Sequence, residues 1–135
     1  MTPVDHARSS AKKFGGMWHD YIELHEWFDE TKALTGDWTH RSLRHHAFGI
    51  QESIKRFGHV ITNLDGRQVP TKLLGEQHVR EDCGFIPTVS DWTEALRSSP
   101  KEWMLKVKTK RKTLMEFTNA TTKKEEMNNG TATTT

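Results

Sequence analysis

Three stretches of helix-spaced apolar residues, each followed by glycine, constrain the fold of this chain most. Apolar and small residues recur every three or four positions in residues 3–14, in about 18–35 and in 37–57. That spacing places them on one face of an α-helix, and a glycine after the last apolar residue commonly ends a helix. The pattern predicts three amphipathic helices that cover one another's apolar faces.

The next segment, residues 59–74, changes from helical to strand-like character. The runs 60–62 and 69–74 favour short strands, and Asp65-Gly66 between them is a strong signal for a tight turn. We therefore predict one small β-hairpin over about residues 59–74, with Pro70 on an edge strand. Helical spacing returns at 75–83 and from Ser90 to Ser98, so the predicted fold class is mainly α, a compact helical domain with one hairpin.

The chain is short and poor in hydrophobic residues. It has 135 residues, of which 33% are hydrophobic, a composition that suits one modest core. We predict a helical domain over residues 1–104 and, over 105–135, a basic and then Thr/Asn-rich tail with almost nothing to bury, which is expected to be disordered. Cys83 is the only cysteine, which excludes an internal disulfide.

The hydropathy and charge patterns bear on location and partners. No run is long and apolar enough to cross a bilayer, and residues 1–6 lack the layout of a secretory signal, so a cytoplasmic location is expected. The formal net charge is +2, and Lys and Arg outnumber Asp and Glu only after residue 100. The stretch Lys106 to Lys112 can attract nucleic acid, although a run this short can equally be a solvated arm.

All eight histidines lie within the first 78 residues, and most share a segment with Asp or Glu. Imidazole and carboxylate are the side chains that bind transition metals or exchange protons near neutral pH. His25 and Asp29 stand four residues apart, as do His78 and Asp82, so a helix would place each pair on one face. His45, on another predicted helix, can add a third imidazole.

These positions predict a site for zinc or another divalent transition metal, with one coordination position open for water if the site is catalytic. The predicted metal ligands are His25, Asp29, His45 and His78. Glu76 and Glu81 are the predicted catalytic carboxylates, as general base in a hydrolytic reaction, and Asp82 is a further supporting carboxylate. The alternative is that each pair is an ordinary surface pair, or a ring hydrogen-bonded to backbone, with the histidines structural.

Arginines are interleaved with these histidines, at Arg41, Arg44 and Arg80. A guanidinium binds a phosphate or carboxylate through two parallel hydrogen bonds. We predict that Arg44 and Arg80 hold a phosphate-containing substrate. The alternative is that these arginines form the solvated side of a helix.

Several strings of the sequence are distinctive as a set, among them His25-Glu-Trp-Phe-Asp29, His40-Arg-Ser-Leu-Arg-His45-His46 and Gly75-Glu-Gln-His78-Val-Arg-Glu81-Asp82. Together they resemble a family of small, histidine-rich proteins encoded by bacteriophages and prophages. The resemblance covers about residues 3–104, and the basic tail after Met104 departs from it. It implies a phage gene product that works in the bacterial cytoplasm or in the virion, and it implies no particular activity.

Two functions follow as expectations. The first is metal-dependent hydrolysis of a phosphate-containing substrate by a phage-type protein. The second is a non-enzymatic phage protein that binds a host protein, a virion component or nucleic acid, with structural histidines. His19 and His59 are expected to be surface residues, whereas the roles of His6, His40 and His46 stay open.

Overall fold

The computed structural model describes residues 1–105. Its contacts define one compact unit, Met1–Ala95, and a second unit that begins at Leu96. The described residues are mainly helical, with one two-stranded antiparallel hairpin, which confirms the predicted fold class. The predicted boundary between residues 104 and 105 stays a prediction. The predicted disorder of the tail and its basic stretch fall outside the described residues.

The first predicted helix is confirmed as α1 (Pro3–Phe14). The Thr2 hydroxyl accepts a hydrogen bond from the Asp5 backbone N–H, and the Asp5 carboxylate accepts one from the Thr2 backbone N–H. Proline fits the first helical position because its missing N–H would have no partner there. The inner face of α1 buries His6, Ala7 and Ser10.

The single helix predicted over about 18–35 is wrong, because the structure divides this segment into three. A 3₁₀-helix, η1 (Trp18–Asp20), precedes α2 (Ile22–Asp29), and a short α3 (Lys32–Thr35) follows after a turn. The turn is held by a tertiary contact, because the buried Thr31 hydroxyl lies 2.9 Å from Nδ1 of His40. Since α2 ends at Asp29, this carboxylate stands at the end of a helix.

The helix predicted over 37–57 is also interrupted, at His45 and His46. It consists of a 3₁₀-helix, η2 (Trp38–His40), then α4 (Arg41–Arg44), then α5 (Ala47–Phe57). His45 leaves the helical conformation, with φ −85° and ψ 68°. His46 caps α5, because its Nδ1 accepts a hydrogen bond from the Gly49 N–H at 3.0 Å.

Gly49 permits this tight junction. A Cβ added at Gly49 would lie 1.8 Å from the carbonyl oxygen of Arg44. Only glycine therefore lets α5 start so close to the end of α4. Because of this break, His45 does not lie on the face that it would occupy in a continuous helix.

The predicted hairpin is confirmed in its first part. β1 (Val60–Thr62) pairs antiparallel with β2 (Gln68–Pro70). Residues 71–74, predicted as strand, instead begin α6 (Thr71–Cys83), which ends at Gly84. The remaining elements are α7 (Val89–Ser98), which starts with reciprocal hydrogen bonds between Thr88 and Asp91, and the 3₁₀-helix η3 (Glu102–Leu105).

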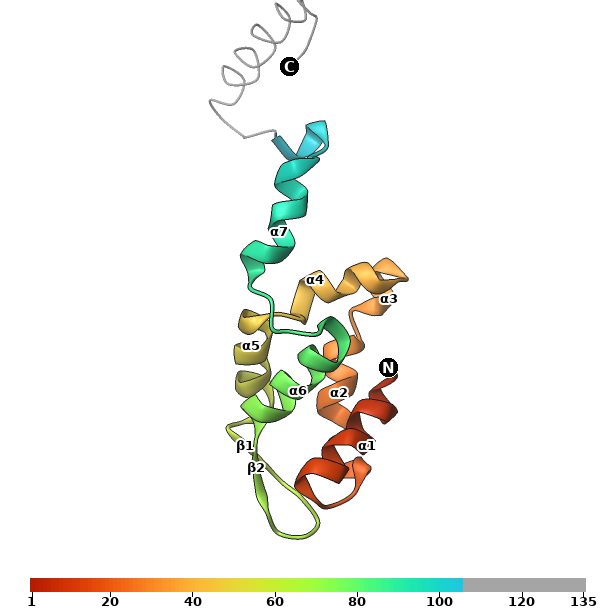
Figure 1. The fold of residues 1–135 in the computed structure, drawn as a ribbon, viewed down its shortest axis with the longest axis vertical. Helices are drawn as coiled ribbons and strands as arrows, with labels where there is room; N and C mark the ends of the chain where they lie inside the picture. The colour runs from red at the N-terminus through yellow and green to blue at the C-terminus, as the bar shows by residue number, and fades with distance from the viewer. Residues whose placement is uncertain (106–135) are drawn as a thin grey trace, which may run out of the picture. The chain divides into compact units, whose positions relative to one another are not determined.

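Within the Met1–Ala95 unit, α6 is the central helix. It packs against α1, α2, α5 and β2 (Figure 1). The apolar core between these elements consists of Ala7, Tyr21, Leu24, Phe28, Ile50, Val69, Leu74 and Val79. In residues 1–105, buried polar side chains outnumber these apolar ones, so the interior is held together by a polar network as well as by a small hydrophobic core.

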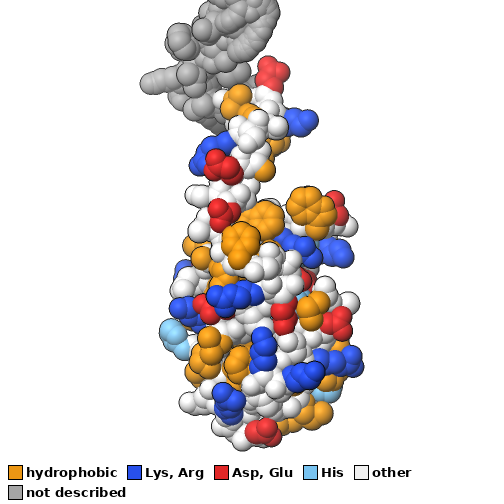
Figure 2. Space-filling view, viewed as in Figure 1, with side chains coloured by type: hydrophobic (Ala, Val, Ile, Leu, Met, Phe, Trp, Pro, Cys, Tyr) orange, Lys and Arg blue, Asp and Glu red, His pale blue; other side chains and the backbone are white. Residues whose placement is uncertain are grey.

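The histidines divide sharply between interior and surface. Six of the eight are buried, namely His6, His25, His40, His45, His46 and His78. The two that were expected at the surface, His19 and His59, are exposed. Figure 2 accordingly shows charged and apolar side chains mixed on the visible face, with few histidines among them. No helix of residues 1–105 is long and apolar enough to span a membrane.

Candidate metal centre

Four side chains bring ligand-type atoms together in the interior of the Met1–Ala95 unit, and we call them the His/Asp cluster: Asp29, His45, His78 and Asp82. Nε2 of His45 lies 2.9 Å from Oδ2 of Asp82 and 3.5 Å from Oδ1 of Asp29. Nε2 of His78 lies 3.3 Å and 3.2 Å from the same two oxygens. The two Nε2 atoms are 3.2 Å apart.

The local structure explains this convergence. His78 and Asp82 are four residues apart on α6 and so share one face of that helix. Asp29 reaches them from the end of α2, and His45 reaches them from the break between α4 and α5. Both histidine side chains are fully buried, whereas the Asp29 side chain is 16% exposed, so Asp29 is the member nearest to solvent.

A chain of buried hydrogen bonds fixes the proton positions behind His78. The Gln77 amide N–H groups donate to the carbonyl oxygen of His6 and to Glu81, so its amide oxygen faces Ser10 and accepts the Ser10 O–H at 2.7 Å. Ser10 has no second proton to give. Nε2 of His25, 2.8 Å from Ser10 Oγ, must therefore be the donor in that contact.

The next link leads from His25 to His78. Burial, together with the neighbouring His78 and His6, lowers the pKa of His25 to about 2, so this ring is neutral and its Nδ1 is an acceptor. Nδ1 of His78 lies 2.8 Å away and must donate to it. Nε2 of His78 then carries a lone pair that faces two carboxylates. A divalent cation bound between this nitrogen and the carboxylate oxygens would use that lone pair.

His6 extends the cluster from α1. Its Nδ1 donates to Oε1 of Glu81 at 2.7 Å, which leaves its Nε2 facing Oδ1 of Asp82 at 3.1 Å. That pair is not aligned as a hydrogen bond, so His6 Nε2 is a buried nitrogen without a hydrogen-bond partner. Nδ1 of His45 is a second such atom. The Glu81–His6 contact is the arrangement by which a carboxylate orients a metal-binding imidazole.

The electrostatics of the cluster keep its carboxylates charged. Burial alone would raise the pKa of Asp82, but its close contacts with His45, His6 and His78 hold that pKa far below its ordinary value. Burial likewise opposes ionisation of Asp29, and His45 and His78 outweigh it, so its pKa is also lowered. Two ionised carboxylates, one buried and one partly exposed, therefore meet beside imidazole nitrogens, a combination of ligand types that binds divalent transition metals.

The donor set and its spacing fit a transition metal. Tetrahedral zinc with bonds of about 2.0–2.1 Å brings neighbouring ligand atoms to about 3.3 Å from one another. Five of the six distances between the four ligand atoms of the His/Asp cluster, all except that between the two carboxylates, run from 2.9 to 3.5 Å. His6 belongs to an overlapping group with Asp29, His78 and Asp82, and His40 to another with Asp29 and His45, each with ligand atoms within 4.8 Å.

The structure therefore brings together three of the four predicted ligands, Asp29, His45 and His78. His25 lies directly behind them and belongs to a further group with His6 and His78. Both of its ring nitrogens are engaged, by Ser10 and by His78. We therefore assign His25 to the support of His78.

The predicted catalytic carboxylates lie elsewhere. Glu76 is on α6 with its carboxylate 3.9 Å from Nζ of Lys72, and it contacts none of the cluster residues by hydrogen bond or ion pair in residues 1–105. Glu81 is engaged by three donors, Ser9, His6 and Gln77. It therefore positions His6, and both of its oxygens already accept hydrogen bonds.

The predicted phosphate-binding arginines also lie apart from the cluster. Arg44 pairs with Glu30 at 2.7 Å and its guanidinium stacks on Trp27, 4.1 Å from the ring centroid. Arg80 is exposed and lines a shallow depression with Glu76 and Lys13. Among the described residues, neither guanidinium contacts a member of the His/Asp cluster.

The structure adds His6 and gives Asp82 a central place. The spacing of His78 and Asp82 was a usable sequence signal, because it predicts a shared helical face. Nothing local marks His6, which joins the cluster only because α1 packs on α6. Membership of His6 thus depends on tertiary packing.

Without metal, the protein is expected to be most stable near pH 6.5. The carboxylates outweigh burial and raise the pKa of His6 and His45, so their contribution is lost as the pH rises above 6.5. Burial lowers the pKa of His25, His40 and His46. The contribution of these three histidines to the stability of the fold is therefore lost as the pH falls below 6.5. Thermal unfolding in EDTA should show this maximum. A melting temperature that still rises from about pH 6.5 to pH 8 would contradict it.

Comparison with known proteins gives a family and no relative of known activity. One family covers residues 1–104, with the description Domain of unknown function (DUF6915). No curated protein and no solved structure matches the chain.

Proposed function

The chain belongs to this family of unknown function, and from the site itself we propose that it is a metal-dependent hydrolase that acts on a phosphate-containing substrate. The observation that carries the proposal is the His/Asp cluster, in which two imidazole Nε2 atoms lie 3.2 Å apart and each lies 2.9–3.5 Å from both carboxylates. The metal is zinc or another divalent transition metal. Bound there, it would lower the pKa of a coordinated water to about 7 and so supply hydroxide at neutral pH.

The residues divide this work between them. His45, His78 and Asp82 are buried and fixed, so they are the ligands that hold the metal. Asp29 is the partly exposed member, so it can either complete the coordination or hydrogen-bond a water at the fourth position. Glu81 orients His6 and His25 orients His78, each by a hydrogen bond to the Nδ1 side of the ring. Such supporting contacts sustain both metal affinity and ligand geometry.

Hydrolysis can be tested directly with chromogenic esters. The zinc-loaded protein is expected to release p-nitrophenolate from p-nitrophenyl phosphate or bis(p-nitrophenyl) phosphate, to lose this activity in EDTA and to regain it on addition of zinc. Asp82→Asn keeps the side-chain shape and should slow the reaction by about 100-fold or more. His59→Ala, at the surface, is the control. Equal rates for wild type and Asp82→Asn would reject the proposal.

A structural metal site is the second candidate, and one observation favours it. The four atoms of the His/Asp cluster suffice to fill a tetrahedral site, and a closed site without water is typical of structural zinc. The protein would then be a non-enzymatic binder. Replacement of the metal by Co²⁺ separates the two, because a bound water that ionises changes the visible spectrum between about pH 6 and 9, whereas a closed site gives one spectrum throughout.

The biological setting is proposed on the resemblance to phage and prophage proteins. It supports a phage gene product in the bacterial cytoplasm or the virion, with a host protein or virion component as the partner of the non-enzymatic alternative. Binding of nucleic acid through Lys106 to Lys112 is a third proposal, which concerns residues outside those that the structure describes. Loss of nucleic-acid binding on deletion of residues 106–135 is its test.

A further inference from the structure

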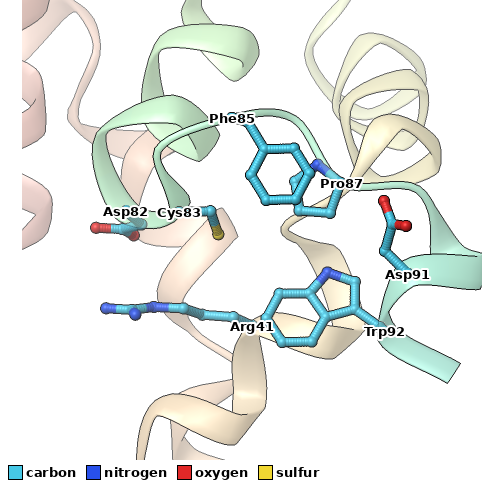
Figure 3. Close-up of a pocket in the computed structure, with 7 residues that line it drawn as sticks. All are labelled: Arg41, Asp82, Cys83, Phe85, Pro87, Asp91 and Trp92. Carbon is cyan, nitrogen blue, oxygen red and sulfur yellow. The ribbon is translucent and has the colours of Figure 1, made fainter. Parts of the chain in front are cut away.

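A small cavity opens beside the His/Asp cluster, and its residues come from α4, α6, α7 and the segment that joins α6 to α7. It has a volume of about 280 Å³ and is lined by Arg41, Asp82, Phe85, Pro87 and Trp92, among others. Figure 3 shows the charged ends of Arg41 and Asp82 at one end, with the rings of Phe85, Pro87 and Trp92 at the other. Asp82 is the residue that the cavity shares with the cluster.

Arg41 is the unusual member of this lining. Its Nε is buried without a hydrogen-bond partner, and within residues 1–105 its guanidinium forms no ion pair with a carboxylate. A half-buried guanidinium without a counter-ion has lost hydration without compensation, so binding of an anion there is favourable. This distinguishes Arg41 from Arg44, whose charge is already paired with Glu30.

The apolar walls are held in place by the same elements that build the cluster. Nε1 of Trp92 donates to the carbonyl oxygen of His45 at 2.9 Å, and the carbonyl oxygen of Pro87 accepts the N–H of Ala47 at 2.9 Å. Phe85 is 55% exposed and leaves its ring free to cover a ligand. The Trp92 and Pro87 walls are therefore preformed on either side of the break at His45, beside the candidate metal ligands, whereas Phe85 is the exposed wall.

The charges in the cavity give a ligand one orientation. Asp91 lies at the apolar end, where its carboxylate accepts the N–H of Thr88 and repels an anion. Asp82 carries the same charge at the other end, so the anionic group lies there only if Arg41, together with the proposed metal bound to Asp82, offsets that charge. A volume of about 280 Å³ is at the lower limit of ligand pockets, which span about 300–1,000 Å³, so the ligand is small.

We propose that this cavity binds a small anion carried on a planar apolar group, with Arg41 holding the anionic oxygens and Phe85, Pro87 and Trp92 enclosing the planar group. This deepens the proposed hydrolase function, on which it rests, because it gives the substrate class as a phosphate monoester of a flat apolar group. It also moves the anion-binding role from Arg44 and Arg80 to Arg41.

Phenylphosphonate is the probe, because its P–C bond resists hydrolysis. Calorimetry of the zinc-loaded full chain should show binding that Arg41→Met weakens at least about ten-fold and Phe85→Ala about three-fold. Arg80→Met and Phe48→Ala, which alter residues of the same type outside the cavity, should leave the affinity within about two-fold of wild type. Circular dichroism confirms that each variant is folded.

The outcomes separate this proposal from the proposed function. If the protein binds zinc but Arg41→Met binds phenylphosphonate as tightly as wild type does, the cavity proposal fails and the metal centre stands. If phenylphosphonate binding depends on Arg41 while no zinc is bound, the cavity stands and the metal centre fails. If inorganic phosphate binds as tightly as phenylphosphonate, the planar group contributes nothing and that part of the proposal is overturned.

Discussion

Zinc affinity is expected to fall by more than 100-fold when Asp82 is replaced by asparagine. Asp82 contacts His45 and His78 through Oδ2 and faces His6 through Oδ1, so its charge acts on every buried imidazole of the site. Loss of an outer-shell partner costs roughly 10–100-fold in metal affinity, and loss of a ligand should exceed that. Competition with a chromophoric chelator measures the change.

Three further variants sharpen this prediction. His78→Ala should also lose zinc, although it leaves a hole in the core, which is why the isosteric Asp82→Asn is the primary variant. His25→Gln removes a supporting ring and should cost only about 10–100-fold. His59→Ala removes an exposed imidazole and should cost nothing measurable. Equal zinc affinity in Asp82→Asn and His59→Ala would falsify the metal centre.

Removal of zinc should lower the melting temperature in the same series. A metal that binds only the folded chain stabilises it by about 2.7 kcal/mol when its free concentration is 100 times the dissociation constant. Wild type and His59→Ala should show this difference between zinc and EDTA. Asp82→Asn should melt at one temperature in both.

The second large effect concerns stability. Gly49→Ala is expected to lower the free energy of unfolding by about 3 kcal/mol or more. The new Cβ would lie 1.8 Å from the Arg44 carbonyl oxygen, and this atom is backbone, so α4 and α5 must move apart. Urea denaturation followed by circular dichroism measures the loss.

Gly36→Ala is the matched control for this substitution. Gly36 has φ +80° but nothing within 4 Å of an added Cβ. Its replacement should therefore cost only the strain of the left-handed conformation, about 1 kcal/mol. Because the same junction positions His45, Gly49→Ala should also weaken zinc binding, while Gly36→Ala should not. Similar losses of stability in the two variants would contradict the steric argument.

The sequence was sufficient to predict the fold class, because helical spacing and glycine stops are local signals. It predicted α1 and the end of α6 well, since helical spacing and a terminal glycine mark them. It could not predict the breaks in 18–35 and 37–57, because the contacts that cause them, Thr31 with His40 and Gly49 with Arg44, are formed by folding.

The same distinction applies to the site. The pairs at four-residue spacing led to Asp29, His78 and Asp82, because a helical face is a local property. Glu76 and Arg80 were natural candidates by sequence neighbourhood, yet they lie on other faces of α6. The place of Arg41 in a cavity and that of His6 behind Asp82 depend on how α1, α6 and the segment after Gly84 pack together, which no local pattern encodes.

The cluster joins residues that are far apart in the chain, since Asp29, His45 and Asp82 come from three different helical regions and His6 from a fourth. Contacts between such distant residues carry a large loop-closure cost, so we expect them to form late in folding. An ion held there therefore adds little to the speed of folding and acts mainly by slowing unfolding. Because His78 and Asp82 lie on α6, the site can form only after the chain has been synthesised through residue 82. A truncated product that ends before α6 would not bind metal there.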